Sequence, residues 1–208
     1  MSRLKVDTIE DRSGSGITLD DTLKVDTISE KTSAGGVTID SLLIKDGSIN
    51  GLITEADQWV LNATTTTSHN PIAGSQYSRN SAISGMTGSH IGTGMSVNST
   101  GHWTFPSTGK WLVRMTADVS FSGYAGGYIY IYGTVNNGTA WTLIGNQNSQ
   151  GQTNYDVGNP KLSALLDIQD TSNYKIYFRW YDENGNAHLR GSSSSSHTVF
   201  DFIRLGDT

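Results

Sequence analysis

Short segments in which apolar and polar residues alternate recur along most of the chain, and Gly, Asn and Ser turns separate them. The clearest alternation runs from Lys110 to Phe121, where Trp111 and every second residue after it are apolar. Side chains two residues apart share one face of a strand, so this pattern predicts a strand with one buried face. The same signal predicts strands at Tyr128–Tyr132, Trp141–Ile144, Leu162–Ile168, Tyr174–Tyr181, Ala187–Leu189 and Thr198–Leu205. Such a series of short strands predicts an antiparallel sandwich or jelly roll over residues 64–208.

A tandem repeat occupies the N-terminal part of the chain. Leu-Lys-Val-Asp-Thr-Ile at residues 4–9 returns at 23–28, and Gly-Ile-Thr-Leu-Asp at 16–20 is echoed by Gly-Val-Thr-Ile-Asp at 36–40. A period of about twenty residues indicates a stacked, elongated architecture. Each copy has too few apolar side chains to bury a core alone, so we expect residues 1–53 to form a β stem whose partner surface comes from identical chains. The residues expected at that shared surface are Leu4, Val6, Ile9, Ile17, Leu19, Leu23, Val25, Ile28, Val37 and Ile39.

Between stem and head, residues 54–63 predict a short helix that forms a collar. Thr54 followed by Asp57 resembles a helix N-cap with an acidic residue in the first turn. Trp59 and Leu61 supply the apolar side on which this helix packs. The expected fold is therefore all-β apart from the collar: a repetitive β stem, a short helix, and a C-terminal antiparallel jelly-roll head.

The net negative charge of the chain comes from its first 57 residues. Residues 1–57 hold six Lys and Arg against eleven Asp and Glu, whereas residues 58–208 hold eight of each. Because phosphate recognition relies on clustered Lys and Arg, this distribution argues against nucleic acid and anionic membranes as partners. The sequence has no cysteine, no apolar run of membrane-spanning length and no N-terminal signal peptide, so we expect a soluble product made in the cytoplasm.

Residue patterns typical of catalysis or metal binding are missing from the sequence. The five histidines lack the i, i+2 or i, i+4 spacing of metal sites, and no Gly-x-Ser-x-Gly elbow is present. The segment 182–186 carries oxygen ligands but lacks the distal Glu of a calcium loop, so a turn explains it better. We therefore expect no enzyme activity, no catalytic residue, no metal and no cofactor. A carboxylate pair of the kind that a depolymerase uses stays open as an alternative.

Two polar segments are candidate ligand-binding loops. Gly145–Gly158 is rich in Asn and Gln and includes Asn154 and Tyr155, and Ser192–Ser196 is a run of serines that includes Ser194. Amide groups and aromatic rings suit hydrogen bonding to carbohydrate and stacking on it. A host surface polysaccharide or receptor is therefore the expected ligand of these loops, and plain solvent exposure is the alternative.

The step into the strand at Lys110 has a distinctive order of residues, Gly-His-Trp-Thr-Phe-Pro-Ser-Thr-Gly-Lys-Trp at 101–111. Together with the aromatic last strand, Val-Phe-Asp-Phe-Ile at 199–203, it resembles the jelly-roll domain of complement globular heads and tumour-necrosis-factor-like ligands. The resemblance covers roughly residues 68–207. It implies that aromatic side chains of one sheet pack around a threefold axis, and a solvent-facing row of tyrosines is the alternative. The candidates for that surface are Tyr128, Tyr130, Tyr132, Tyr177 and Tyr181.

The order of stem, junction and head also resembles a class of viral structural proteins. The stem repeats, then Ile-Thr-Glu-Ala-Asp-Gln-Trp at 53–59 and Ile-Gly-Thr-Gly-Met at 91–95, are similar to fibre-like proteins of tailed bacteriophages, particularly marine and cyanobacterial phages. The resemblance implies a homotrimeric virion protein whose prism-like stem docks on other virion proteins. The function that it implies is that of a short tail fibre or spike whose head adheres to the host surface. A capsid-decorating fibre or cement protein with a purely structural role is the alternative.

Overall fold

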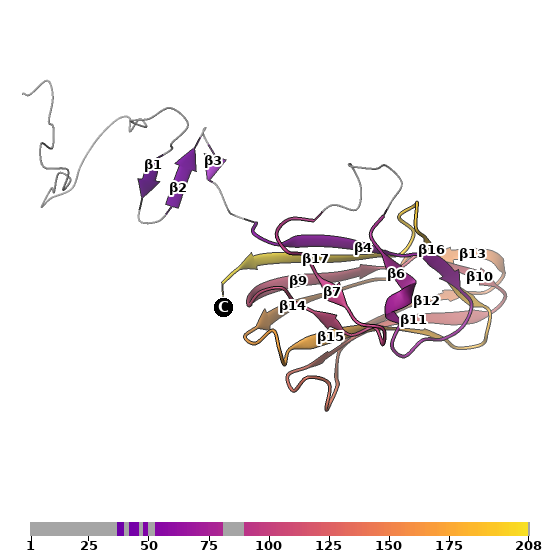
Figure 1. Ribbon diagram of the computed structural model, residues 1–208. Coiled ribbons are helices and arrows are strands. Elements are labelled where there is room, and N and C mark those ends of the chain that lie inside the picture. Colours follow the sequence, from indigo (N-terminus) through magenta and orange to yellow (C-terminus); the bar gives the residue numbers. More distant parts are fainter. Residues whose placement is uncertain (1–36, 40–41, 46–47, 50–52, 81–89, 208) are drawn as a thin grey trace, which may run out of the picture. The chain divides into compact units, whose positions relative to one another are not determined.

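The computed structural model describes residues 37–39, 42–45, 48–49, 53–80 and 90–207. Within this part the chain forms β strands and one 3-10 turn at Gly74–Gln76, so the fold is all-β as the alternation predicts. The chain divides into two units, Met1–Asn50 and Gly51–Thr208. Figure 1 shows the described strands of each. No helix in the described part is long and apolar enough to cross a membrane.

The first unit contains a small antiparallel sheet in its described residues. Strands β1 (Val37–Ile39), β2 (Leu42–Lys45) and β3 (Ser48–Ile49) pair in that order. Val37 and Ile39, two of the residues expected at the shared surface of the stem, lie on β1. The others, from Leu4 to Ile28, lie outside the described residues, so a stem shared between identical chains stays a prediction.

The second unit is a jelly roll made of three antiparallel sheets. Its strands are β4 (Ala56–Leu61), β5 (Ala63–Thr65), β6 (Tyr77–Ser78), β7 (Ser96–Val97), β8 (Trp103–Thr104), β9 (Gly109–Thr116), β10 (Val119–Ser122), β11 (Ala125–Thr134), β12 (Thr142–Gly151), β13 (Asn154–Gly158), β14 (Lys161–Ile168), β15 (Lys175–Asp182), β16 (Ala187–Ser192) and β17 (Val199–Gly206). Two five-stranded sheets have the orders β14-β9-β17-β4-β6, the β17 sheet, and β12-β11-β15-β8-β7, the β11 sheet. A four-stranded sheet, β13-β10-β16-β5, lies at the end of the unit away from the C-terminus (Figure 1).

The core of the second unit lies between the two five-stranded sheets. Trp103 of β8 packs against Phe202 of β17 with ring centroids 4.8 Å apart, so this contact joins the β11 sheet to the β17 sheet. The side chains predicted to face inward from the strand at Lys110 are all buried, which confirms that prediction: Trp111, Val113, Met115, Ala117, Val119 and Phe121. The predicted single strand is interrupted between β9 and β10, where the chain leaves the β17 sheet for the four-stranded sheet.

The helix expected over residues 54–63 is wrong, because this segment forms strand β4 between β17 and β6. β4 pairs with β17 from Val60 opposite Val199 to Ala56 opposite Ile203. Pairing with the last strand of the chain satisfies the backbone groups that a helix would have satisfied locally, and the local sequence does not reveal it. The segment therefore belongs to the jelly roll and does not form a separate collar.

Trp59 and Leu61 pack inward as expected, although from a strand instead of a helix. Leu61 is fully buried in the core. The ring of Trp59 meets Trp103 edge-on at 5.2 Å, and the guanidinium of Arg79 lies 4.4 Å from the centroid of the same ring. These contacts anchor β4 on the β8 side of the core.

The loop expected over Gly145–Gly158 is also wrong. β12 continues to Gly151, and Asn154 and Tyr155 begin β13, which pairs with β10. In the described part of the chain β12 pairs only with β11, so it is an edge strand. Its exposed side chains need no apolar alternation, and for this reason the periodicity that predicts strands is missing here.

The residues before β9 bring this strand close to β17. Gly109 has a φ of 135°, which side chains with a Cβ rarely adopt. A Cβ at this position would also collide with the carbonyl oxygen of Gly206 on β17. Phe105 packs on Trp111 with ring centroids 5.2 Å apart. The Phe-Pro-x-x-Gly-x-Trp order therefore allows the close approach of two strands and places Trp111 in the core.

Candidate functional site

The five tyrosines expected to share a surface lie together on the outward side of the β11 sheet. Alternation along β11 turns Ile129 and Ile131 into the core and leaves three tyrosines outside. The residues opposite them on β15 share this face, because cross-strand partners lie on the same side of a sheet. The resulting surface, the tyrosine face, consists of Tyr128, Tyr130 and Tyr132 on β11 and Tyr177, Arg179 and Tyr181 on β15. Its place at a trimer axis stays a prediction.

The rings of the tyrosine face form a continuous series of contacts. Tyr132 stacks on Tyr177 with centroids 4.8 Å apart and an interplanar angle of 14°. The ring centroid of Trp141 lies 4.7 Å from that of Tyr177, and the ring centroid of His102 lies 4.6 Å from that of Trp141. The aromatic surface therefore extends beyond the tyrosines. The sequence did not reveal the last two residues as members, because only tertiary contacts bring Trp141, which precedes β12, and His102, which precedes β8, beside Tyr177.

Arg179 is the cation in the middle of the tyrosine face. Its guanidinium carbon lies 4.9 Å from the ring centroid of Tyr130 and 5.4 Å from that of Tyr181. No ion pair joins it to a carboxylate among the described residues. Its charge is therefore held by ring faces alone and stays open to an anion.

Three phenols of this face have a raised pKa and keep their protons. The Glu183 carboxylate, 3.4 Å from the Tyr128 hydroxyl, raises the pKa of Tyr128. Burial raises the pKa of Tyr130 and of Tyr177. Because the pKa of a tyrosine is ordinarily about 10, these three hydroxyls are neutral hydrogen-bond donors at physiological pH.

A row of amides borders the tyrosine face along β12. Asn148 stands opposite Tyr128, Asn146 stands opposite Tyr130, and all of these residues share one side of the sheet. Both asparagines are exposed. Within the described part of the chain, no hydrogen bond engages either of their side chains. Each therefore presents a free amide donor and a free carbonyl acceptor beside the rings.

The outward side of the β17 sheet has a different character. One line of directly opposed residues crosses it from the bridge at Ile91 to the edge strand β14. This apolar row consists of Ile91, Ala56, Ile203, Leu112 and Leu165. Leu165 is 67% exposed and Ile91 is 50% exposed. A single chain therefore leaves an aliphatic stripe in contact with water, as surfaces that meet another protein do.

The polar residues beside the apolar row satisfy one another. Asp201 accepts hydrogen bonds from Arg114 Nε at 2.9 Å and from Gln58 Nε2 at 2.7 Å. The Arg114 guanidinium also pairs with the Asp201 carboxylate at 2.8 Å. Another protein surface can cover this part of the sheet without leaving a charge unpaired.

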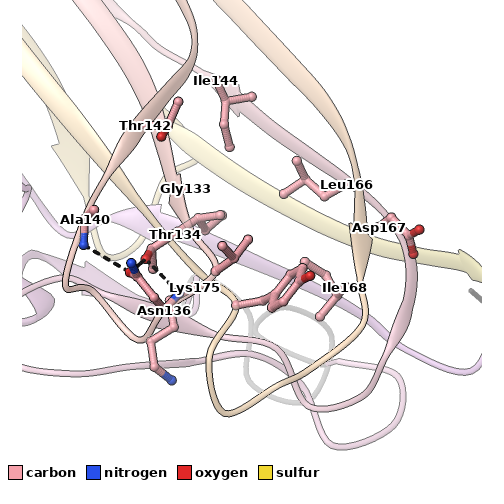
Figure 2. A pocket seen from close by; sticks show the side chains of 13 residues that line it. Gly133, Thr134, Asn136, Ala140, Thr142, Ile144, Leu166, Asp167, Ile168 and Lys175 are labelled. Carbon is pink, nitrogen blue, oxygen red and sulfur yellow. Dashed lines mark hydrogen bonds between the residues drawn. The ribbon is translucent and has the colours of Figure 1, made fainter.

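A pocket of about 330 Å³ opens between the edge strands β12 and β14 and the nearby ends of β11 and β15 (Figure 2). Its walls are mainly aliphatic, and Figure 2 shows Ile144, Leu166 and Ile168 among them. The charged groups at its rim are already engaged: Asp167 pairs with Lys110, and Lys175 donates to the Thr104 hydroxyl at 3.1 Å. The pocket therefore suits an apolar group.

The other expected site residues do not gather around these surfaces. Ser194 is exposed in the connection between β16 and β17. The segment 182–186 forms a turn, as predicted, in which Asp182 Oδ1 accepts backbone N–H groups of Asn184, Gly185 and Ala187 at 3.0–3.3 Å. Among the described residues, no group of three or more His, Asp or Glu could hold a metal ion.

Comparisons with known proteins agree with the jelly-roll geometry. No protein family and no curated protein sequence matches the chain. Among solved structures, Eiger TNF from S. frugiperda has a TM-score of 0.54 and 13% sequence identity, over 74% of this chain and 93% of that one. Murine APRIL at pH 5.0 has a TM-score of 0.50 and 9% identity, over 73% of this chain and 99% of that one. The chain thus contains a jelly roll similar in fold to tumour-necrosis-factor-like proteins, as the residues before β9 implied.

Proposed function

We propose that this protein is a homotrimeric structural protein of a tailed bacteriophage, a short tail fibre or spike whose head adheres to the host cell. Residues 1–53 of three chains form the stem and dock on other virion proteins, and the jelly roll points to the host. The repeats support this proposal because each copy needs identical partners to bury its apolar residues. The protein is made in the host cytoplasm and is then exposed on the virion surface.

The apolar row is the observation that supports a homotrimer. Contact with a second copy would remove Leu165 and Ile91 from water, and burial of apolar surface contributes roughly 25 cal/mol per Å². Burial of the tyrosine face would instead require partners for its phenols and for the guanidinium of Arg179. We therefore propose the apolar row as the subunit contact of the head. The tyrosine face, the untested candidate for that contact, is then the solvent-facing row of tyrosines that was its alternative.

A threefold arrangement needs two different surfaces on each chain, because every copy gives one side of the contact and receives the other. The apolar row supplies one aliphatic surface. The pocket between β12 and β14 supplies a second, at the edge of the same unit. Three heads on one stem, and several fibres on one particle, would raise a weak affinity for the host by multivalency.

Exchange of Leu165 for Glu tests the subunit contact. We expect the wild-type chain to have three times the chain mass of 22.4 kDa by light scattering at micromolar concentration. Leu165→Glu should lower that mass, since a charge would enter the contact. Val157→Glu is the matched control, because Val157 is 62% exposed on β13, away from the apolar row. A wild-type chain that runs as a single copy would overturn the homotrimer.

The position of the protein on the particle separates the fibre from the structural alternative. Gold-labelled antibodies against the jelly roll, applied to phage that encodes this chain, are expected to mark the tail. Label spread over the capsid would favour the decorating or cement protein. Particles without label would contradict both.

A further inference from the structure

We infer that the tyrosine face, together with Asn146 and Asn148, binds an acidic polysaccharide. This inference rests on the proposed adhesive function, to which it gives a site and a ligand class. The site lies on paired strands, where backbone pairing fixes the positions of the side chains.

The aromatic rings supply the first part of the recognition. Their π faces carry partial negative charge, and the C–H groups of a pyranose ring carry partial positive charge, so a sugar packs well on an aromatic surface. The series of rings from Tyr128 to Trp141 is continuous, since each ring contacts the next. Tyr177 is only 8% exposed beneath its neighbours, so the rings open to a sugar are the half-buried ones of Tyr128, Tyr130 and Tyr132. A single chain can therefore accommodate more than one sugar unit along β11.

The amides of β12 supply the second part. Two residues along an antiparallel strand advance by about 6.8 Å, so Asn146 and Asn148 repeat at the same interval as Tyr130 and Tyr128 beside them. Each free amide can donate one hydrogen bond and accept another, which matches neighbouring hydroxyl groups of a sugar. Rings and amides at a regular interval suit a polymer of repeated units.

Arg179 selects for acidic sugars. Its guanidinium lies between the rings of Tyr130 and Tyr181 and has no carboxylate partner among the described residues. A guanidinium binds a carboxylate through two parallel hydrogen bonds, and these are stronger than bonds between neutral groups. The head has no net charge from residue 58 onward, so an anionic polymer meets no general repulsion there.

Other partner classes fit this face less well. Nucleic acid binding needs clustered cations, and the tyrosine face has one. A protein partner would bury the free amides and the guanidinium, and each would then need its own hydrogen-bond partner. Acidic sugars carry hydroxyl and carboxyl groups at high density, so they can supply hydrogen-bond partners for both amides and for the guanidinium.

Isothermal titration of the full-length protein with defined oligosaccharides tests the inference. The acidic probes are hexamers of galacturonate and of mannuronate and a tetramer of sialic acid, and the neutral probe is an α-1,6-linked glucose hexamer. We expect at least one acidic probe to bind and the neutral probe to bind at least about tenfold more weakly. Arg179→Gln should weaken the acidic probe about tenfold or more, and Asn146→Ala with Asn148→Ala about fivefold.

Lys161→Gln is the matched control for charge. Lys161 is an exposed cation on β14 of the other sheet, so its removal should leave affinity unchanged within about twofold. Light scattering and thermal melting of each variant establish that fold and oligomeric mass are retained.

Several results would overturn the inference. These are no binding of any acidic probe, equal binding of the neutral probe, an equal loss in Lys161→Gln, or a changed oligomeric mass in Arg179→Gln. The last result would make the tyrosine face a subunit contact. Absent binding together with antibody label on the tail would remove this site and leave the proposed function in place. Binding of an acidic probe by a protein that the antibodies do not find on the particle would support this site and contradict the proposed function.

Discussion

Asp57 illustrates how a charge is held inside the jelly roll. Its side chain is 1% exposed and accepts from Arg79 Nε at 3.0 Å and from the Arg79 terminal nitrogen at 2.7 Å. The indole of Trp59 and the backbone N–H of Met95 donate to it at 2.8 Å each. One carboxylate therefore links β4 to Arg79 and Met95, which lie on either side of the segment 81–89. Each of its donors relies on this carboxylate as hydrogen-bond acceptor.

Asp57→Ala should cost roughly 3 kcal/mol of unfolding free energy, because the donors of Arg79, Trp59 and Met95 lose their acceptor in a buried place. Asp207→Ala is the control: this carboxylate pairs with Arg204 but is 92% exposed, so little change is expected. Urea titration of both full-length variants measures the difference. Equal losses of stability would contradict the structural role of Asp57.

His69 makes the stability of the jelly roll depend on pH. Burial lowers the pKa of His69, whose Nε2 lies 2.7 Å from the Thr65 hydroxyl. The unfolded chain therefore binds the proton more readily than the folded chain. Stability linked to this residue is present above the unfolded pKa of about 6.5 and is lost as the pH falls below it.

We expect the melting temperature to fall between pH 7.5 and pH 5, and to fall less in His69→Gln, which keeps hydrogen-bonding groups but does not titrate. Burial and the nearby Lys175 also lower the pKa of His102, so His102→Gln should reduce the remaining dependence. Calorimetry at several pH values gives the slopes. A slope in the double variant equal to that of the wild type would refute this account.

At the scale of single elements, alternation predicts strands well where one face meets the core. In β15, Ile176, Phe178 and Trp180 are buried as the pattern indicates, because this strand lies inside the β11 sheet. β4 was mistaken for a helix because Thr54 and Asp57 imitate a helix start, while its true partner is about 140 residues away. The part of β12 from Gly145 onward was mistaken for a loop because an edge strand can carry polar residues on both sides.

The tyrosine face and the apolar row also differ in how far the sequence predicts them. The tyrosine face follows from alternation along β11 and β15, so the sequence could place its tyrosines on one surface. The apolar row could not be found, because each of its residues comes from a different segment and looks isolated in its own. Only the register of the strands aligns them. Local patterns therefore reveal surfaces along a strand and miss surfaces across a sheet.

At the scale of the whole molecule, the stem should require three chains. Val6→Asp with Val25→Asp in the full-length chain is expected to lower the mass below three copies at micromolar concentration, because charges would face the shared interior. Lys5→Asp with Lys24→Asp is the matched control, since these positions alternate with the valines and should face solvent. Unchanged mass and unchanged melting in the valine variant would argue against a shared stem.

β12 is ten residues long and contains neither a charged residue nor a proline, and its outer edge is hydrogen-bonded to no other strand in the described part of the chain. Natural sheets guard such edges with lysine, proline or a cover, because a bare edge is a template for strands of other molecules. Subunits produced faster than they find their companions should therefore join edge to edge and precipitate. The pace of assembly would then limit the yield of usable protein more than the stability of one copy does.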